Sequence, residues 1–105
     1  MRIIETSVFT KRLMNLLPDE EYRKLQAEIV MNPEKGKLIV GSGRLRKIRW
    51  LILGKGKSGG ARIIYYWAKA KEIILMLLIY SKNEQDDLSC EQLKILKSLV
   101  QKEFK

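Results

Sequence analysis

An unbroken run of eight apolar residues, Ile73–Tyr80, limits the folds open to this chain of 105 residues. The run is far shorter than the roughly 18–20 residues that a membrane-spanning helix needs. Successive side chains of a strand point to opposite sides of its sheet, so a strand that is apolar throughout needs cover on both faces. We therefore predict that Ile73–Tyr80 is a central strand with structure packed against both faces.

The hydrophobic pattern changes its period at Pro33, which divides the chain into a helical part and a strand-rich part. Before Pro33, apolar residues at helical spacing predict helices over Val8–Leu17 and from Pro18 to about Asn32. After Pro33, segments rich in Ile, Leu, Val, Tyr and Trp predict strands. The predicted strands are Leu38–Val40, Leu45–Leu53, Ala61–Trp67 and Ile73–Tyr80, with Arg2–Glu5 as a candidate short first strand.

A last helix is predicted from Ser89, because Ser89-Cys90-Glu91-Gln92 matches a capping box. The connection Lys69–Glu72 is short enough for a hairpin, so the strands that it joins are expected to be antiparallel neighbours. The predicted fold class is α+β, with two N-terminal helices packed on a mainly antiparallel, roughly four-stranded twisted sheet and a C-terminal helix after it. Residues 1–105 are expected to form one domain, since this length supports a single core.

Positive charge is concentrated in Lys35–Lys71, which holds 11 of the 21 Lys and Arg residues and no Asp or Glu. The formal net charge of the chain is +9, yet the residues outside this stretch carry 10 basic and 12 acidic groups. A polyanion such as RNA is the natural partner of such a surface, because each neutralised phosphate releases counterions. The alternative is a solvated basic face without a partner.

The scarcity of thiol and imidazole groups limits the chemistry. With no histidine and one cysteine, Cys90, the sequence predicts no structural zinc and no internal disulfide, and we expect no cofactor. The acidic run Glu84–Asp87 could hold Mg²⁺, and the sequence leaves this alternative open. Glu5 interrupts the first apolar residues and no apolar run would span a bilayer, so we expect a soluble, cytoplasmic protein without a membrane partner.

A glycine-rich segment, Gly54–Gly60, contains the spacing G-x-G-x-x-G of a dinucleotide-binding loop. That loop must open a helix whose N–H groups bind a pyrophosphate, whereas a predicted strand, Ala61–Trp67, follows here. We therefore reject nucleotide-cofactor binding. The glycines instead permit close approach to a sugar–phosphate chain, which Lys55 and Lys57 would contact.

Strand alternation separates the basic residues of the next segments. Lys47 and Arg49 are predicted on one face of their strand and Arg46 on the other. Arg62 begins an otherwise apolar strand, and its planar guanidinium suits a phosphate better than a lysine would. We predict that Arg62 contacts phosphate; the alternative is an edge arginine paired with a carboxylate.

Three segments together resemble the RelE/HigB-type toxins of bacterial toxin–antitoxin pairs, most of all HigB-like members of the RelE/ParE superfamily. They are Gly41–Arg49, Gly54–Tyr66 and Tyr80–Leu88. The resemblance implies a RelE-like fold and a metal-independent endoribonuclease that cuts mRNA on the ribosome through the ribose 2′-OH and inhibits translation. It also implies a cognate antitoxin, which we expect to be a HigA-like helix-turn-helix protein. The chain would contact operator DNA only through this antitoxin. Its other expected partners are mRNA and ribosomal RNA.

The resemblance also suggests which residues form the site. The catalytic candidates are Arg62, Lys82, Lys47 and Arg49. Arg62 would stabilise the transition-state phosphate, and Lys82 or Lys47 would transfer a proton. The RNA-binding candidates are Arg46, Lys55, Lys57, Tyr65, Tyr80 and Asn83.

Two positions depart from the family pattern. Asn83 aligns with an arginine of the best-known branch, and Ser89 lies near a tyrosine of that branch. These departures leave open a non-catalytic binding module of the same superfold, either a gyrase-inhibiting ParE-like toxin or an RNA- or ribosome-binding protein.

Overall fold

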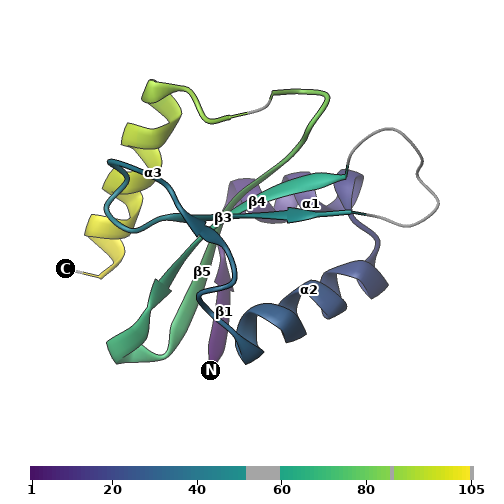
Figure 1. Cartoon of the computed structure of the whole chain (residues 1–105), viewed down its shortest axis with the longest axis horizontal. Helices are drawn as coiled ribbons and strands as arrows, with labels where there is room; N and C mark the ends of the chain where they lie inside the picture. Colours follow the sequence, from purple (N-terminus) through teal and green to yellow (C-terminus); the bar gives the residue numbers. More distant parts are fainter. Residues whose placement is uncertain (52–59, 86, 105) are drawn as a thin grey trace.

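The computed structural model describes residues 1–51, 60–85 and 87–104. In chain order they form strand β1 (Arg2–Glu5), helices α1 (Ser7–Leu16) and α2 (Asp19–Met31), strands β2 (Lys37–Leu38), β3 (Arg46–Trp50) and β4 (Ala61–Ala68), the 3-10 helix η2 (Lys69–Lys71), strand β5 (Ile73–Ser81) and helix α3 (Cys90–Glu103). Figure 1 shows the strands running between α3 on one side and α2 on the other. Among these residues, no helix combines the length and apolar character that crossing a membrane requires.

The sheet has five strands in the order β1-β5-β4-β3-β2. Neighbours from β5 to β2 are antiparallel, whereas β1 runs parallel to β5. The α+β prediction is confirmed. The sheet has one strand more than the roughly four predicted, because β1 pairs with the outer edge of β5.

The apolar run Ile73–Tyr80 is an interior strand with core on both faces, as predicted, since β5 lies between β1 and β4. Its buried residues divide between two clusters, Ile74, Met76 and Ile79 in one and Leu75, Leu77, Leu78 and Tyr80 in the other. We call the side of the first cluster the first face of the sheet and the side of the second cluster the second face.

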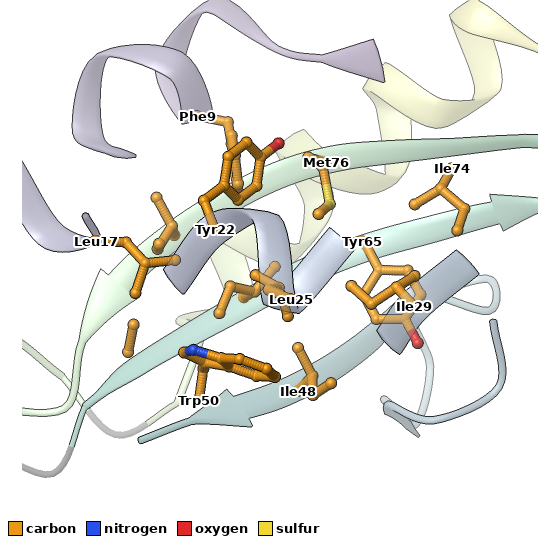
Figure 2. Packing of buried hydrophobic residues seen from close by; sticks show 13 residues of the cluster. Phe9, Leu17, Tyr22, Leu25, Ile29, Ile48, Trp50, Tyr65, Ile74 and Met76 are labelled. Atoms are coloured by element: carbon orange, nitrogen blue, oxygen red, sulfur yellow. The ribbon is translucent and has the colours of Figure 1, made fainter. Parts of the chain in front are cut away.

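The first face is covered by α1 and α2. Its buried residues come from both helices and from β3, β4 and β5, and Figure 2 shows the helical side chains over the strands; among them are Phe9, Tyr22, Leu25, Ile29, Ile48, Trp50 and Tyr65. The hydroxyl of Tyr22 donates to Glu5 Oε2 at 2.6 Å, and burial together with this bond raises the pKa of Tyr22. Beneath α1 and α2, this face is a closed hydrophobic core.

The second face is covered by α3 over part of its area. Leu96 and Val100 of α3 are buried in one cluster with Leu45, which precedes β3, and with apolar residues of the sheet such as Ile64. The helix begins where predicted, because Ser89 Oγ accepts from the Gln92 N–H at 3.1 Å and Gln92 Oε1 accepts from the Ser89 N–H at 3.0 Å.

Several element boundaries differ from the prediction for local reasons. Pro18 is the N-cap of α2 rather than its first helical residue. β2 ends at Leu38, because a turn follows in which Ser42 Oγ donates to Ile39 O at 2.5 Å and accepts from the Leu45 N–H at 2.9 Å. Residues 52 and 53, the end of a predicted strand, lie outside the described residues.

Candidate functional site

Three cationic side chains lie on the second face, on two neighbouring strands. Lys47 and Arg49 alternate with the buried Ile48 and Trp50 of the first face, so both belong to the second face. In the ladder of β3 and β4, Arg49 stands directly opposite Arg62, and Lys47 stands opposite a residue of the second cluster. We call Lys47, Arg49 and Arg62 the cation cluster.

Arg62 is the most deeply placed member of the cation cluster. It is 6% exposed, and charged residues are rarely buried to this extent unless they have partners. Like charges directly opposite on neighbouring strands destabilise a sheet, so the Arg49–Arg62 pair opposes folding stability. Two arginines directly opposite on neighbouring strands form an arrangement that is suited to an anion.

An acidic side chain reaches the cation cluster from the segment before α3. Asp87 Oδ1 lies 2.7 Å from Lys47 Nζ. The hydrogen bond and charge of Lys47, with smaller contributions from Arg49 and Arg62, lower the pKa of Asp87. The Asp87 side chain is 78% exposed, so its carboxylate sits where a phosphate from solvent could replace it.

The turn after β5 is fixed by Arg12 of α1. Arg12 Nε donates to Ile79 O at 2.7 Å, and its guanidinium binds the Glu84 carboxylate. Glu84 Oε1 also accepts from the Ser81 N–H at 3.2 Å. The hydrogen bond from Arg12 lowers the pKa of Glu84, so this carboxylate keeps its charge, and its bond to Arg12, to a lower pH than an ordinary glutamate would.

Lys82 and Asn83 lie in this turn and are exposed. The Lys82 N–H donates to Gly60 O at 3.3 Å, which places the turn beside the start of β4, two residues before Arg62. Tyr80, at the end of β5, stands opposite Arg62 in the ladder and is fully buried. Arg62 and Tyr80 each make further interactions. The backbone therefore brings Lys82, Asn83 and Tyr80 to the neighbourhood of the cation cluster.

The arrangement is suited to binding a phosphate. Lysine and two arginines from adjacent strands can surround an anion, and arginine offers paired N–H donors that match phosphate oxygens. The residues present provide cations and a carboxylate, which are groups for charge stabilisation and proton transfer. Among the described residues, no group of three or more His, Cys, Asp or Glu side chains could hold a metal ion.

A comparison with protein families gives one match over residues 1–105, to the RelE toxin of the RelE / RelB toxin-antitoxin system. The chain belongs to the RelE toxin family. Its fold is also similar to a chain in the crystal structure of the intact E. coli RelBE toxin-antitoxin complex, with a TM-score of 0.59 and 18% sequence identity. The match covers 74% of this chain and 92% of that chain. The RelE-like fold and the toxin family are therefore confirmed.

Two predicted RNA-binding residues of this RelE-family chain lie on the first face, away from the cation cluster. The Tyr65 hydroxyl donates to Pro33 O at 2.8 Å and accepts from the Gly36 N–H at 2.9 Å, and the residue is fully buried, which raises its pKa. Arg46 shares this face, as strand alternation predicted. Tyr65 therefore offers no surface for RNA. Strand alternation in β4 already separates Tyr65 from Arg62, since the two residues are three positions apart and an odd spacing puts them on opposite faces.

Two other predicted residues of the RelE-family site, Lys55 and Lys57, lie outside the described residues. Two residues near the site were not predicted to contribute to it, Arg12 and Asp87. Arg12 lies in a helix far from the basic stretch in sequence, and Asp87 was considered only within an acidic run for Mg²⁺. The structure instead pairs Glu84 with Arg12 and Asp87 with Lys47.

Proposed function

We propose that this RelE-family chain is a ribosome-dependent, metal-independent mRNA endonuclease that inhibits translation in the cytoplasm. The observation that carries the proposal is the cation cluster, in which Lys47, Arg49 and Arg62 share one sheet face and Arg49 stands opposite Arg62. The family match supports the toxin role. Membership of the HigB-like branch stays a prediction.

The reaction that suits this site uses the RNA as its own nucleophile. The ribose 2′-oxygen attacks the adjacent phosphorus, a proton leaves the 2′-OH, and the bond from phosphorus to the 5′-oxygen breaks as that oxygen gains a proton. The products are a 2′,3′-cyclic phosphate and a 5′-hydroxyl. The protein must transfer two protons and stabilise the charge on the crowded phosphate, and it needs no nucleophile of its own.

The residues of the site divide these tasks. Arg62 and Arg49 would stabilise the phosphate oxygens, since their planar guanidinium groups donate paired hydrogen bonds. Lys47, whose Nζ already donates to Asp87, would protonate the leaving oxygen once a phosphate replaces the carboxylate. Lys82 is the second candidate for proton transfer, and the exposed Asn83 would contact the RNA beside it. Tyr80 was predicted to bind RNA as well, but it is fully buried opposite Arg62 and offers no surface for RNA.

A cognate antitoxin is the proposed partner. The similar chain belongs to a complex described as a toxin–antitoxin complex. By extension we propose a HigA-like helix-turn-helix antitoxin for this chain, which would also be its only link to operator DNA. The basic character of the chain suits an acidic segment of that partner.

Induced expression in a bacterium tests the proposal. The wild-type chain should arrest growth, and primer extension should show discrete breaks in translated transcripts, whereas Arg62→Ala should do neither. Arg23→Ala is the matched control, because it removes an exposed arginine of α2. Equal harmlessness of wild type and Arg62→Ala, with intact transcripts, would contradict the nuclease. Growth arrest with DNA-damage signalling and unbroken transcripts would support the gyrase-inhibiting alternative.

A further inference from the structure

A second group of cations surrounds a cavity on the first face, beyond the part that α1 and α2 cover. The cavity has a volume of about 130 Å³ and is lined by Glu34, Leu38, Arg44, Arg46, Trp67 and Lys69. A water molecule takes up roughly 30 Å³ of liquid, so the cavity has room for a group of several heavy atoms. Its cations come from the turn before β3, from β3 itself and from η2.

Two of these cations are held in place by the fold. Arg46 Nη1 donates to Glu34 O at 3.0 Å and to Gly36 O at 2.7 Å, and its side chain is only 16% exposed. Lys69 Nζ lies 5.6 Å from the centre of the Trp67 ring, within the range of a cation–π contact. These side chains would therefore lose little conformational freedom when an anion binds.

Arg44 adds a separate observation. Its φ is +78°, in the left-handed region where a side chain costs roughly 1–2 kcal/mol and where glycine is the ordinary choice. Backbone strain of this kind gathers at functional sites, and here it falls on a cation that lines the cavity.

The acidic residue at the cavity does not neutralise the group firmly. Glu34 Oε2 is 4.0 Å from Arg46 Nη2, and the Glu34 side chain is 67% exposed. An exposed pair at that distance contributes little, so an incoming anion can replace the carboxylate. Three cations against one weakly paired acid favour an anion with more than one oxygen.

The cavity is distinct from the cation cluster. Trp67 lies on the first face and Arg62 on the second, and five positions along β4 separate them, which corresponds to roughly 16 Å along the strand. One phosphate cannot touch both groups. An RNA that reached both would have to pass around the edge of the sheet or belong to a large folded RNA.

We propose that this cavity binds a phosphodiester of ribosomal RNA and anchors the chain while the cation cluster acts on mRNA. The choice of ribosomal RNA rests on the proposed function. The recognition itself rests on Arg44, Arg46 and Lys69, which present guanidinium and ammonium donors to phosphate oxygens.

Co-sedimentation of the full chain with 70S ribosomes over a range of salt concentrations tests this proposal. The test variant is Arg44→Gly with Lys69→Gln, because glycine accepts the φ of position 44 and the fold is retained. The matched control is Lys94→Gln with Lys102→Gln, which removes two exposed lysines of α3. We expect the test variant to bind ribosomes on the order of tenfold more weakly, with a salt slope smaller by roughly 1.4–1.8, and the control to change far less.

Three results would overturn the proposal: no ribosome binding by the unmodified chain, equal losses in the test and control variants, or an unchanged salt slope. A titration with inorganic phosphate, followed by the indole N–H resonance of Trp67 in an NMR spectrum, distinguishes a site for free anions from a site for RNA. The proposal would also be overturned if inorganic phosphate saturated the cavity of the unmodified chain while the test variant bound ribosomes as tightly as the unmodified chain does. If the test variant loses ribosome binding while Arg62→Ala still cuts transcripts, the cavity stands and the assignment of the cation cluster fails.

Discussion

Along part of β3 and β4, neighbouring positions of the same strand carry opposite kinds of side chain on the two faces of the sheet. On the first face, Ile48, Ile63 and Tyr65 pack beneath α1 and α2 in a closed core. On the second face, the neighbouring positions carry Arg49 and Arg62, and α3 covers only the apolar part. One step along β4 therefore separates a side chain of the closed core from a side chain of the cation cluster.

This difference indicates why the cation cluster can be preorganised. Arg62 lies between two buried residues of the first face, Ala61 and Ile63, so the core fixes the backbone from which the guanidinium projects. Electrostatic stabilisation of a reacting phosphate depends on donors that are already in place. The core thus stabilises the positions of charges that would otherwise repel each other.

The largest expected effect on activity is that of Arg62→Gln. This substitution should lower the rate of mRNA cleavage in a translating extract by about 10²–10³-fold, the usual cost of removing one donor to a transition-state anion. Circular dichroism and urea unfolding of the same variant must show a folded protein. A rate close to that of the wild type would mean that the second face is not the reacting face.

The matching substitution on the first face is Ile63→Ala. It should lower the free energy of unfolding by about 2–5 kcal/mol, because a fully buried side chain leaves a cavity beneath the helices. Urea denaturation measures this loss. Below the unfolding transition the variant should keep the cleavage rate per folded molecule, and a large fall in that rate would break the proposed division between the faces.

A smaller effect is expected from Tyr65→Phe. The change removes the hydroxyl that accepts from the Gly36 N–H and donates to Pro33 O, leaving a buried N–H without its acceptor. We expect a loss of about 1–3 kcal/mol in unfolding free energy and no change in RNA binding. Weaker binding of RNA at unchanged stability would restore Tyr65 as an RNA contact.

The smallest effect is predicted for Asp87→Asn. Removing the carboxylate that pairs with Lys47 should strengthen RNA binding at pH 7 by about two- to fivefold, the scale of an exposed ion pair. Lys47 lowers the pKa of Asp87. The ion pair is therefore complete at every pH above the ordinary pKa of an aspartate, and it is lost only as the pH falls through the lowered pKa of Asp87. The variant and wild type should therefore differ equally between pH 6 and pH 8. Loss of cleavage in Asp87→Asn would instead make Asp87 a participant in the reaction.

Sequence alone was sufficient where a property depends on neighbouring residues. The apolar run Ile73–Tyr80 identified the interior strand, Ser89 and Gln92 identified the start of α3, and alternation placed Lys47 and Arg49 on one face. Each of these depends on a local period or on a fixed short spacing.

Contacts between distant segments could not be predicted in this way. Asp87 is 40 positions from Lys47, and no local pattern indicates that the chain brings them together. The parallel pairing of Arg2–Glu5 with β5 likewise depends on the whole path of the chain. For Tyr65 the local pattern was informative, because strand alternation puts it on the face opposite Arg62, whereas the family resemblance suggested an RNA contact.

The most direct test of the central claim uses one mRNA with a single 2′-O-methyl group at a mapped cleavage position. The wild-type chain should cut the unmodified mRNA in a translating extract, leave a 2′,3′-cyclic phosphate and a 5′-hydroxyl, and fail to cut at the methylated position. Cleavage at the methylated position, or a 5′-phosphate at the break, would contradict the account.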